Sequence, residues 1–323
     1  MNDQYNAVRW AVGLLDLSGR GKIEVTGPDR ETFLHAMISN EVNQLPVFSG
    51  RYGTFLTSTG KMVSDLFYYK FPDFILIDIQ RDLLSRTIET LEKFIIMDEV
   101  YLKDRSQDFD HISIQGPDSR RLIEELFGEG MTTGQYQIHE LAWTGAKLWL
   151  IGKPELAGAG FEIVSPIESR DSLRRAVLNR GRQFGMLEIT PETFDVLRLE
   201  AGIPRFGVDM DENNYPMEAR LNHAISLTKG CYIGQEVVSK ATHIGGVARL
   251  LSRLRISGEK VPKEGWEVFD PEGKKIGRVT SAAFSPQFGC PIAFAYLKRA
   301  FAQAGQSCTI RSGSGDTLAA EVE

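Results

Sequence analysis

One stretch of eight residues, Lys229 to Glu236, brings a thiol, an amine, an amide and a carboxylate close together in the chain. It reads Lys-Gly-Cys-Tyr-Ile-Gly-Gln-Glu, so Cys231 lies two residues after the lysine. A nearby ammonium favours the thiolate form of a cysteine, and glycines let the backbone turn tightly or approach a ligand. Two interpretations are open: a reactive site built on Cys231 and Lys229, or a glycine-rich turn that carries an ordinary cysteine.

A carboxylate on the apolar side of a predicted helix is the second candidate. The capping pattern, with Pro191 in the first turn, predicts a helix over 191–201. Glu200 falls on its apolar arc, in the last turn, where a negative charge needs a partner. That partner is expected to be Arg198 or Arg205, or else the adjacent N–H donors of a flat heterocycle such as a pterin or guanine.

Asp65 raises the same question on a strand predicted over 62–69. Strand alternation puts Asp65 on one face with Phe67 and Tyr69. If that face lines a cleft, the carboxylate could position an amine while an aromatic ring stacks on the ligand. The alternative interpretation is an aspartate at the edge of a sheet, facing water.

Several familiar sites are excluded by spacing. The three cysteines (Cys231, Cys290 and Cys308) form no C-x-x-C pair, so we expect neither a zinc site, nor a four-thiolate cluster, nor a disulfide framework. The sequence contains no H-E-x-x-H and no G-x-S-x-G. Residues 209–220 lack the glycine and the bidentate glutamate of a calcium loop. We therefore expect no metal site.

Composition limits the classes of protein further. The 323 residues are 42% hydrophobic and 25% charged, as in an ordinary globular protein. A net charge of −6 disfavours non-specific binding to nucleic acid, which depends on phosphate neutralisation. No apolar run approaches the roughly 18 residues of a membrane span, and the first residues lack a signal or transit pattern. We expect a cytoplasmic monomer that binds neither membrane nor nucleic acid.

The elements that position these residues are indicated by an internal repeat. Residues 23–29 recur in form as 111–118, each copy reading as an alternating strand followed by a Gly-Pro-Asp turn and a helix. Apolar residues in the two helices fall at matching offsets, which predicts two related α+β subdomains. Apolar stripes also predict helices over 82–97 and 169–184.

After about residue 247 the sequence changes to short β-like runs broken by Gly, Pro and Ser. Such spacing predicts a small antiparallel barrel or sandwich. We therefore expect the two α+β subdomains in residues 1–246 and a β domain in residues 247–323.

Taken together, these residues resemble the folate-binding superfamily of the glycine cleavage T-protein over nearly the whole chain. The matching segments are Gly27-Pro28-Asp29, Ser39-Asn40-Glu41-Val42, Gly60 to Leu66, Arg198-Leu199-Glu200-Ala201-Gly202 and Pro216-Met217-Glu218-Ala219. Ser64 stands where the T-protein strand has the first of two aspartates. Lys229 to Glu236 matches the K-G-C-[FY]-x-G-Q-E signature of the YgfZ branch, which T-proteins proper lack.

The resemblance implies a fold, a cofactor and its contacts. The fold class is α+β, a three-lobed ring of two ferredoxin-like α/β subdomains and a C-terminal antiparallel β-barrel. The implied cofactor is tetrahydrofolate, with Glu200 holding the pterin and Asp65 approaching the reactive nitrogens. Arg198, Tyr232 and Gln235, which belong to the matched segments, are also assigned to folate binding.

For function, the resemblance implies a tetrahydrofolate-binding accessory protein for the assembly or repair of iron–sulfur clusters, including those of tRNA-modifying enzymes. Its expected partners are folate and iron–sulfur client or assembly proteins, and its expected catalytic residues are Cys231, Lys229 and Asp65. The alternative is a folate-dependent aminomethyltransferase or another one-carbon transferase of the T-protein type. A third interpretation is a scaffold that no longer binds folate. Whether the chain is an enzyme stays open between them.

Overall fold

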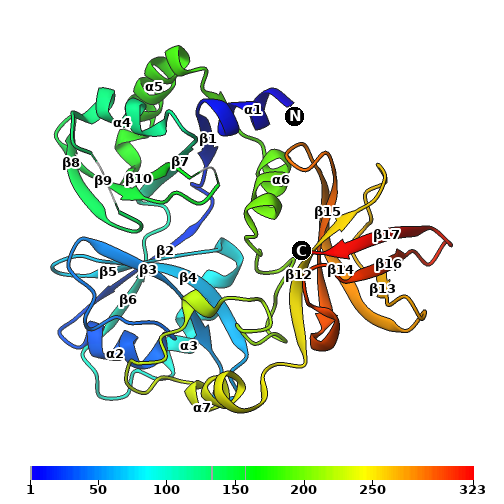
Figure 1. Cartoon of the computed structure of the whole chain (residues 1–323). Coiled ribbons are helices and arrows are strands. Elements are labelled where there is room, and N and C mark those ends of the chain that lie inside the picture. The colour runs from blue at the N-terminus through cyan, green and yellow to red at the C-terminus, as the bar shows by residue number, and fades with distance from the viewer. Residues whose placement is uncertain (1, 132–133, 157) are drawn as a thin grey trace. The chain divides into compact units, whose positions relative to one another are not determined.

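The computed structural model describes residues 2–131, 134–156 and 158–323, and the chain divides into two compact units. Unit 1 comprises Met1–Phe55, Ser64–Thr193 and Thr228–Tyr232, and unit 2 comprises Leu56–Val63, Phe194–Leu227 and Ile233–Glu323. Figure 1 shows the elements coloured by their position in the chain. The segment that carries Lys229 and Cys231 therefore belongs to unit 1, although it is far from the rest of that unit in sequence.

One sheet of unit 1 runs in the order β3-β4-β5-β2-β6, and its β4–β5, β5–β2 and β2–β6 neighbours are antiparallel. Its strands are β2 (Gly21–Thr26), β3 (Ser49–Leu56), β4 (Met62–Lys70), β5 (Ile75–Ile79) and β6 (Tyr101–Asp104). Helices α2 (Arg30–Met37) and α3 (Leu84–Glu92) accompany it, and η1 (Arg81–Leu83) leads into α3 (Figure 1). β5 is buried on both faces, and four of its five residues are apolar, the exception being Asp78.

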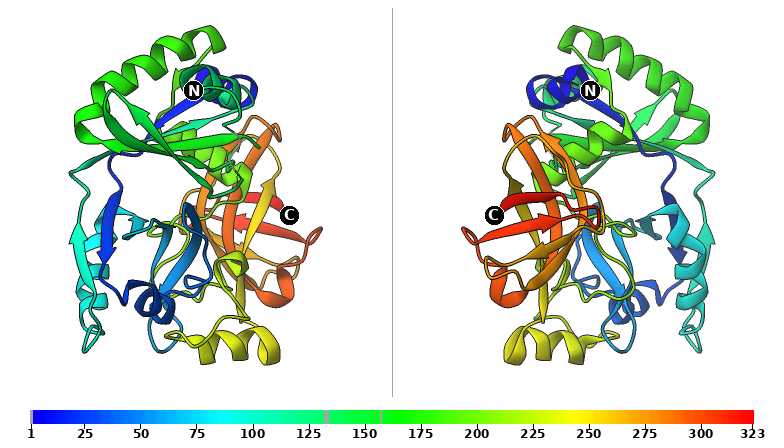
Figure 2. Two further views of the ribbon diagram at one scale, coloured as in Figure 1. Left: turned by 90° about the vertical axis from the view of Figure 1, so that its left-hand side faces the viewer. Right: turned by 90° about the vertical axis from the view of Figure 1, so that its right-hand side faces the viewer.

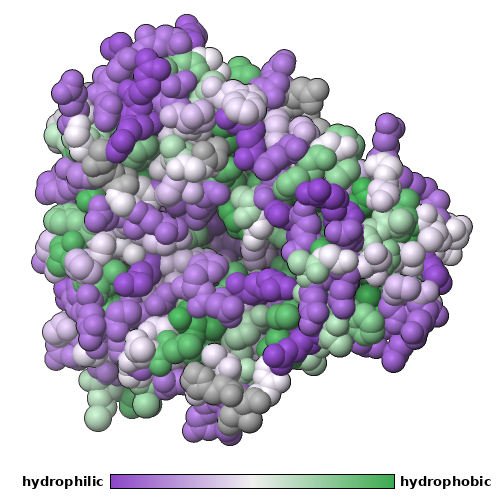
Figure 3. All heavy atoms as spheres, viewed as in Figure 1, coloured by the Kyte–Doolittle hydropathy of each residue, from purple (hydrophilic) through white to green (hydrophobic). Residues whose placement is uncertain are grey.

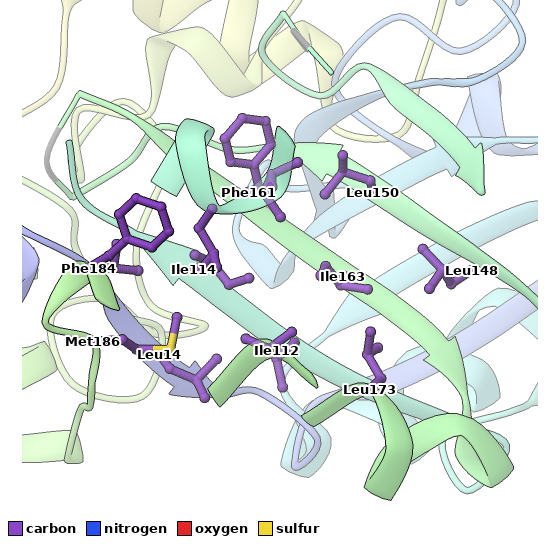
Figure 4. Close-up of a cluster of buried hydrophobic side chains, with 14 residues drawn as sticks. Leu14, Ile112, Ile114, Leu148, Leu150, Phe161, Ile163, Leu173, Phe184 and Met186 are labelled. Atoms are coloured by element: carbon purple, nitrogen blue, oxygen red, sulfur yellow. The ribbon is translucent and has the colours of Figure 1, made fainter. Parts of the chain in front are cut away.

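The other sheet of unit 1 runs in the order β11-β1-β7-β10-β9-β8. Its strands are β1 (Gly13–Asp16), β7 (Phe109–Gln115), β8 (Ile138–Trp143), β9 (Ala146–Gly152), β10 (Gly160–Pro166) and β11 (Leu187–Glu188). Its helical segments are α1 (Asn2–Trp10), α4 (Ser119–Phe127), η2 (Ile167–Ser169), α5 (Arg170–Gly181) and η3 (Arg182–Phe184). α4 and α5 lie side by side, and Figure 4 shows Leu173 of α5 in one apolar cluster with Ile112 of β7 and Ile163 of β10.

The internal repeat is confirmed in the structure. β2 and β7 each end in a Gly-Pro-Asp turn that leads into α2 and α4, respectively. Gly27 and Gly116 have φ values of 101° and 127°, a region that favours glycine. A Cβ at Gly27 would lie 1.9 Å from the carbonyl oxygen of Glu99, so close backbone approach also excludes a side chain there.

Unit 2 contains an antiparallel barrel, one of the two architectures that the sequence pattern predicted. Its strands close in the order β12-β15-β14-β13-β16-β17. They are β12 (Arg249–Ile256), β13 (Glu267–Phe269), β14 (Lys275–Ser285), β15 (Cys290–Lys298), β16 (Ser307–Arg311) and β17 (Thr317–Val322). Figure 2 shows this barrel in yellow to red from two sides. Alternating apolar side chains, such as Leu254, Val279 and Ile310, fill its interior.

The remaining helical segments connect these parts. They are α6 (Pro191–Ala201), η4 (Asn222–Ala224), α7 (Gln235–Lys240), η5 (Ala241–Gly245) and η6 (Arg299–Phe301). α6 has the bounds that its capping pattern predicted, whereas the helix expected over 82–97 is shorter. α3 ends at Glu92, because the N–H groups of Phe94 and Ile95 bond three residues back and tighten the last turn.

The surface seen in Figure 3 is mostly hydrophilic, with hydrophobic residues in small scattered groups. Among the helices in the described residues, none is long and apolar enough to cross a membrane.

A buried row of ionisable side chains joins the two sheets of unit 1. Lys22 of β2 lies 2.8 Å from Asp78 of β5, and its Nζ is 3.1 Å from Nδ1 of His111 on β7. The Nε2 atom of His111 lies 3.1 Å from Glu162 of β10, which in turn lies 3.0 Å from Lys153. All five side chains are almost completely buried. Each charge therefore depends on its neighbours in the row.

This row predicts a loss of stability in mild acid. Burial, together with the Lys22 ammonium, lowers the pKa of His111 below its ordinary value of about 6.5. Below that pH the unfolded chain binds a proton that the folded chain does not, so stability falls as the pH drops. We expect the free energy of unfolding to fall between pH 7 and 5 with a His111 contribution of up to about 1.4 kcal/mol per pH unit.

The measurement is urea unfolding at several pH values for the wild type and His111→Gln. Glutamine accepts from Lys22 and donates to Glu162 but does not titrate, so its stability should change less over this range. The carboxylate of Glu162, whose pKa is lowered to about 2, becomes important only below about pH 4.5. Equal pH slopes for the two proteins would contradict the assignment.

Candidate functional site

Asp65 lies on β4, a central strand of its sheet, so the interpretation as an edge residue facing water is wrong. Its Oδ2 atom accepts a hydrogen bond of 2.8 Å from the hydroxyl of Tyr52. Its Oδ1 atom is buried and has no hydrogen-bond partner within the described part of the chain. Burial raises the pKa of Asp65, and the Tyr52 hydroxyl partly opposes that rise. One oxygen of the carboxyl group is thus held by Tyr52, and the other can accept a hydrogen bond from a ligand.

Two further aromatic rings are linked to the Tyr52 ring that contacts this carboxyl group. The ring of Phe67, two residues along β4, lies 4.9 Å from that of Tyr52 and 5.7 Å from that of Tyr136. Tyr52 is buried, whereas Phe67 and Tyr136 are half-buried and can present part of a ring to a ligand. Phe67 is therefore linked to Asp65 through Tyr52, which contacts both side chains. Tyr69 instead contributes to the apolar cluster between the two sheets of unit 1.

Tyr136 is held in an unusual backbone conformation. Its φ is 60°, in the left-handed region that bulky residues rarely adopt. Two hydrogen bonds of 2.7 Å fix it there, one from its N–H to Gly152 and one from the N–H of Gly50 to its carbonyl oxygen. Backbone strain that neighbouring structure maintains is common in ligand-binding regions.

Charged side chains lie close to the Phe67 ring. The Nζ atom of Lys153 lies 3.3 Å from the centre of the Phe67 ring, and Cζ of Arg20 lies 5.8 Å from it. Glu155, 3.9 Å from Lys153, is half-buried, and burial raises the pKa of its carboxyl group. The surroundings of Asp65 therefore include aromatic rings and two cations, Lys153 and Arg20. Burial raises the pKa of both carboxyl groups, those of Asp65 and Glu155.

Lys229 has a structural setting that the sequence did not indicate. Its Nζ donates to the carbonyl oxygens of His35, Ile38 and Asn40 at 2.5, 2.6 and 2.8 Å. These carbonyls belong to the end of α2 and the segment after it, where a cation is favourable. An ammonium has three N–H donors, and these three carbonyl groups can take up all of them. Burial lowers its pKa to about 8, and the carboxylate of Glu41 opposes this.

Replacing Lys229 by methionine should therefore destabilise unit 1. Three buried carbonyl groups would lose a charged donor, which costs about 2–3 kcal/mol in the free energy of unfolding. Urea denaturation measures this, with Lys240→Met on the exposed end of α7 as the matched control that should stay near the wild type. A Lys229→Met protein as stable as the control would show that these bonds do not anchor the segment.

The rest of the octapeptide divides between turn and surface. Cys231 is an exposed free thiol, and Tyr232 is buried with its ring centre 5.1 Å from Nζ of Lys229. Gly234 has φ 83°, and a Cβ there would lie 2.7 Å from the carbonyl oxygen of Thr57, so this glycine serves a tight turn. Gln235, the first residue of α7, is half-buried. The glycine-turn interpretation therefore holds for Gly234, while Cys231 is accessible.

Glu200 has partners that neither arginine hypothesis predicted. Its Oε1 atom accepts hydrogen bonds from the hydroxyl of Ser285 and, at 3.3 Å, from the N–H of Gln287. Both donors lie at the end of β14 or in the turn that follows it, within unit 2. Both of these donors are neutral groups, a hydroxyl and a backbone N–H.

Arg198 is committed to ion pairs inside unit 2. Its Nη1 lies 2.6 Å from Oδ2 of Asp209 and its Nε lies 2.7 Å from Asp195. Both Arg198 and Asp209 are almost completely buried. These contacts give Arg198 a structural role and leave its assignment to folate binding without support.

The structure places the predicted site residues in two groups. Asp65, Lys229, Cys231 and Tyr232 belong to unit 1, and Arg198, Glu200 and Gln235 belong to unit 2. Sequence reasoning missed Tyr52, Tyr136, Lys153 and Glu155, whose importance depends on which strands are neighbours. Among the described residues no cluster of three or more His, Cys, Asp or Glu side chains is arranged to hold a metal ion.

Comparison with known proteins finds two matching family models. The model described as GCVT N-terminal domain matches residues 1–229. The model described as Glycine cleavage T-protein C-terminal barrel domain matches residues 249–323.

Similar proteins extend over nearly the whole chain. An aminomethyltransferase from Chloroherpeton thalassium is 31% identical over 305 residues, 93% of this chain and 83% of that protein. One from Desulfitobacterium hafniense is 28% identical over 310 residues, 95% of this chain and 84% of that protein. The crystal structure of glycine cleavage system aminomethyltransferase T from Bartonella henselae matches 99% of this chain and 87% of that chain with a TM-score of 0.90. At 23% identity, that likeness shows the fold, and it confirms the α+β class with a C-terminal antiparallel barrel.

Proposed function

The chain belongs to the glycine cleavage T-protein family, and from that premise we propose that it binds a tetrahydrofolate and uses it in one-carbon chemistry. The observation that carries the proposal is the carboxyl group of Asp65. One of its oxygens is fixed by Tyr52, and the other is buried without a hydrogen-bond partner among the described residues. Such an atom is costly unless a ligand or water donates to it.

The residues around Asp65 fit a reduced folate. A pterin is flat and carries N–H donors, which suit aromatic rings and a carboxylate oxygen, respectively. Phe67, Tyr52 and Tyr136 provide the rings, and Asp65 provides the acceptor. As the resemblance implies, we propose Glu200 as a carboxylate that binds folate, and keep Tyr232 and Gln235 as proposed folate contacts. When bound, tetrahydrofolate supplies the nitrogen atoms that take up the one-carbon unit.

Of the possible uses of the folate, transfer of an aminomethyl group or another one-carbon unit has the most support. Both curated relatives described above are aminomethyltransferases. Asp65 suits such a reaction, because burial raises its pKa toward the range in which a carboxyl group can hold and release a proton. The Tyr52 hydroxyl fixes Oδ2, so the proton moves at Oδ1.

A second candidate function is favoured by the exposed Cys231. In the YgfZ branch, which the octapeptide resembles, the protein would be a folate-dependent accessory factor for iron–sulfur clusters, including those of tRNA-modifying enzymes. An accessible thiol can meet a partner protein, whereas a buried one cannot. One thiolate is too few to hold a cluster, so cluster contact would require ligands from an iron–sulfur client or assembly protein.

A paired experiment separates the two uses. Transfer from an aminomethyl donor to tetrahydrofolate is measured with purified wild type, Asp65→Asn and Cys231→Ala. Activity of iron–sulfur enzymes is measured in cells that lack the protein and receive each variant. The transferase proposal predicts that wild type and Cys231→Ala transfer the carbon and that Asp65→Asn does not. No transfer by the wild type, with enzyme activity in cells restored by wild type but not by Cys231→Ala, would contradict it and favour the accessory role.

We also propose that residues 1–246 and 247–323 act as separate domains. The two family matches, which end at residue 229 and begin at residue 249, are compatible with a boundary at this position.

A further inference from the structure

We propose that Lys153 is a positioning residue for the ligand-binding rings. The buried row from Asp78 to Lys153, together with the half-buried Arg20 that pairs with Asp78, holds Lys153 against Phe67. The inference rests on the proposed function, because folate is the ligand whose binding it affects. It assigns a role to buried ionisable groups that the proposed chemistry does not use.

The row fixes the protonation of His111. The Lys22 ammonium has only N–H donors, so Nδ1 of His111, 3.1 Å away, must accept. The ring proton therefore resides on Nε2, which donates to Glu162 at 3.1 Å. A protonated imidazole would turn an N–H toward the ammonium and break the row. His111 is thus neutral, with one defined tautomer.

The two ends of the row meet at one aromatic ring. Asp78 binds Arg20 at 2.9 Å, and Cζ of Arg20 lies 5.8 Å from the centre of the Phe67 ring. At the other end Glu162 binds Lys153, whose Nζ lies 3.3 Å from that ring centre. A cation close to a ring face, away from water, is strongly attracted to it. Both ends therefore constrain Phe67.

The position of Phe67 in turn affects Tyr52, Tyr136 and Asp65, which are proposed to bind the ligand. Its ring contacts those of Tyr52 and Tyr136, and Tyr52 donates to Asp65. Lys22 and Asp78 come from one sheet of unit 1, and His111 and Glu162 come from the other. The row thus fixes the positions of the Phe67, Tyr52 and Tyr136 rings relative to both sheets of unit 1. Buried ion pairs often stabilise a protein no more than apolar residues would, so fold stability alone does not account for it.

The test uses the whole chain and a charge-balanced variant. Lys153→Met combined with Glu162→Gln removes the cation from Phe67 without leaving its partner charge buried, and Lys103→Met on the exposed strand β6 is the control. His111→Gln keeps an acceptor for Lys22 and a donor for residue 162, whereas His111→Leu keeps neither. Titration calorimetry gives the Kd for tetrahydrofolate at a temperature where thermal melting shows every variant folded.

We expect Kd to rise about tenfold for the double variant and for His111→Leu, and to change less than about threefold for His111→Gln and Lys103→Met. In NMR spectra of the protein without ligand, His111 should show the neutral Nε2–H tautomer. The Phe67 ring signals should shift and broaden in the double variant and in His111→Leu, and stay unchanged in His111→Gln and Lys103→Met. A wild-type Kd and unchanged Phe67 signals in the folded double variant would overturn the proposal, as would an imidazolium at pH 7.

Failure of the proposed function would give a different set of results from failure of the positioning role. If the wild type binds no tetrahydrofolate, the folate proposal fails. The NMR signals of Phe67 and His111 then decide the positioning role alone, since they require no ligand.

Discussion

Asp65→Asn is expected to lower the rate of folate-dependent one-carbon transfer by about 100-fold or more, the usual contribution of a positioned acid or base. Asparagine keeps the size of the side chain and can still accept from the Tyr52 hydroxyl, but it cannot hold or release a proton at Oδ1. The loss should therefore appear in kcat at saturating tetrahydrofolate, with a smaller change in folate affinity.

The matched control for this prediction is Asp73→Asn, which changes an exposed aspartate of the same unit. Its rate should equal that of the wild type. An Asp65→Asn rate within about threefold of the wild type would remove Asp65 from the chemistry, because a proton carrier in the reaction contributes far more than that.

Arg198→Met is expected to have the largest effect on stability, a loss of about 3–5 kcal/mol in the free energy of unfolding. The substitution leaves the carboxylate of Asp209 buried without its ion-pair partner. Thr280 and Ser281 still donate hydroxyl hydrogen bonds to Asp209, but neither carries a charge. Urea denaturation of the whole chain measures the loss.

Two further variants make the Arg198 result specific. Asp209→Asn combined with Arg198→Met removes the uncompensated charge and should recover part of the lost stability. Arg205→Met, which breaks a more exposed pair with Asp195, should cost less than about 1 kcal/mol. If Arg198→Met instead keeps wild-type stability and loses folate affinity, the original assignment of Arg198 to folate binding is restored.

The sequence predicted those parts of the fold that short-range patterns encode. The strand, Gly-Pro-Asp turn and helix at residues 23–38 and 111–127 follow from alternation, capping and apolar periodicity, and the structure has both copies. The change to short strands near residue 247 predicted a small antiparallel barrel or sandwich, and the structure has the barrel. Helix α3 was predicted too long, because Ile95 and Ile96 extend the apolar pattern although the helix ends at Glu92.

The candidate site could be predicted only in part. Asp65 and Glu200 were identifiable because a carboxylate on an apolar face needs an explanation wherever it lies. Their partners were not, since Tyr52 reaches Asp65 across neighbouring strands and Ser285 reaches Glu200 from a segment 85 residues away. Such contacts depend on strand order and register, which local sequence does not encode.

The octapeptide shows the same limit. Its residues indicated an ammonium that favours the thiolate form of Cys231, because Lys229 and Cys231 are close in sequence. In the structure the ammonium faces carbonyl groups about 190 residues earlier in the chain. Lys229 therefore fixes the segment in unit 1, while Cys231 remains exposed. Closeness in sequence identified the segment but not what its lysine binds.

Titration calorimetry of the whole chain with tetrahydrofolate tests the central claim most directly. We predict saturable binding of one folate per chain by the wild type, and a Kd at least about tenfold higher for Glu200→Gln, which loses a charged acceptor. A wild-type chain that gives no saturable binding, at folate concentrations up to the millimolar range, would contradict the account.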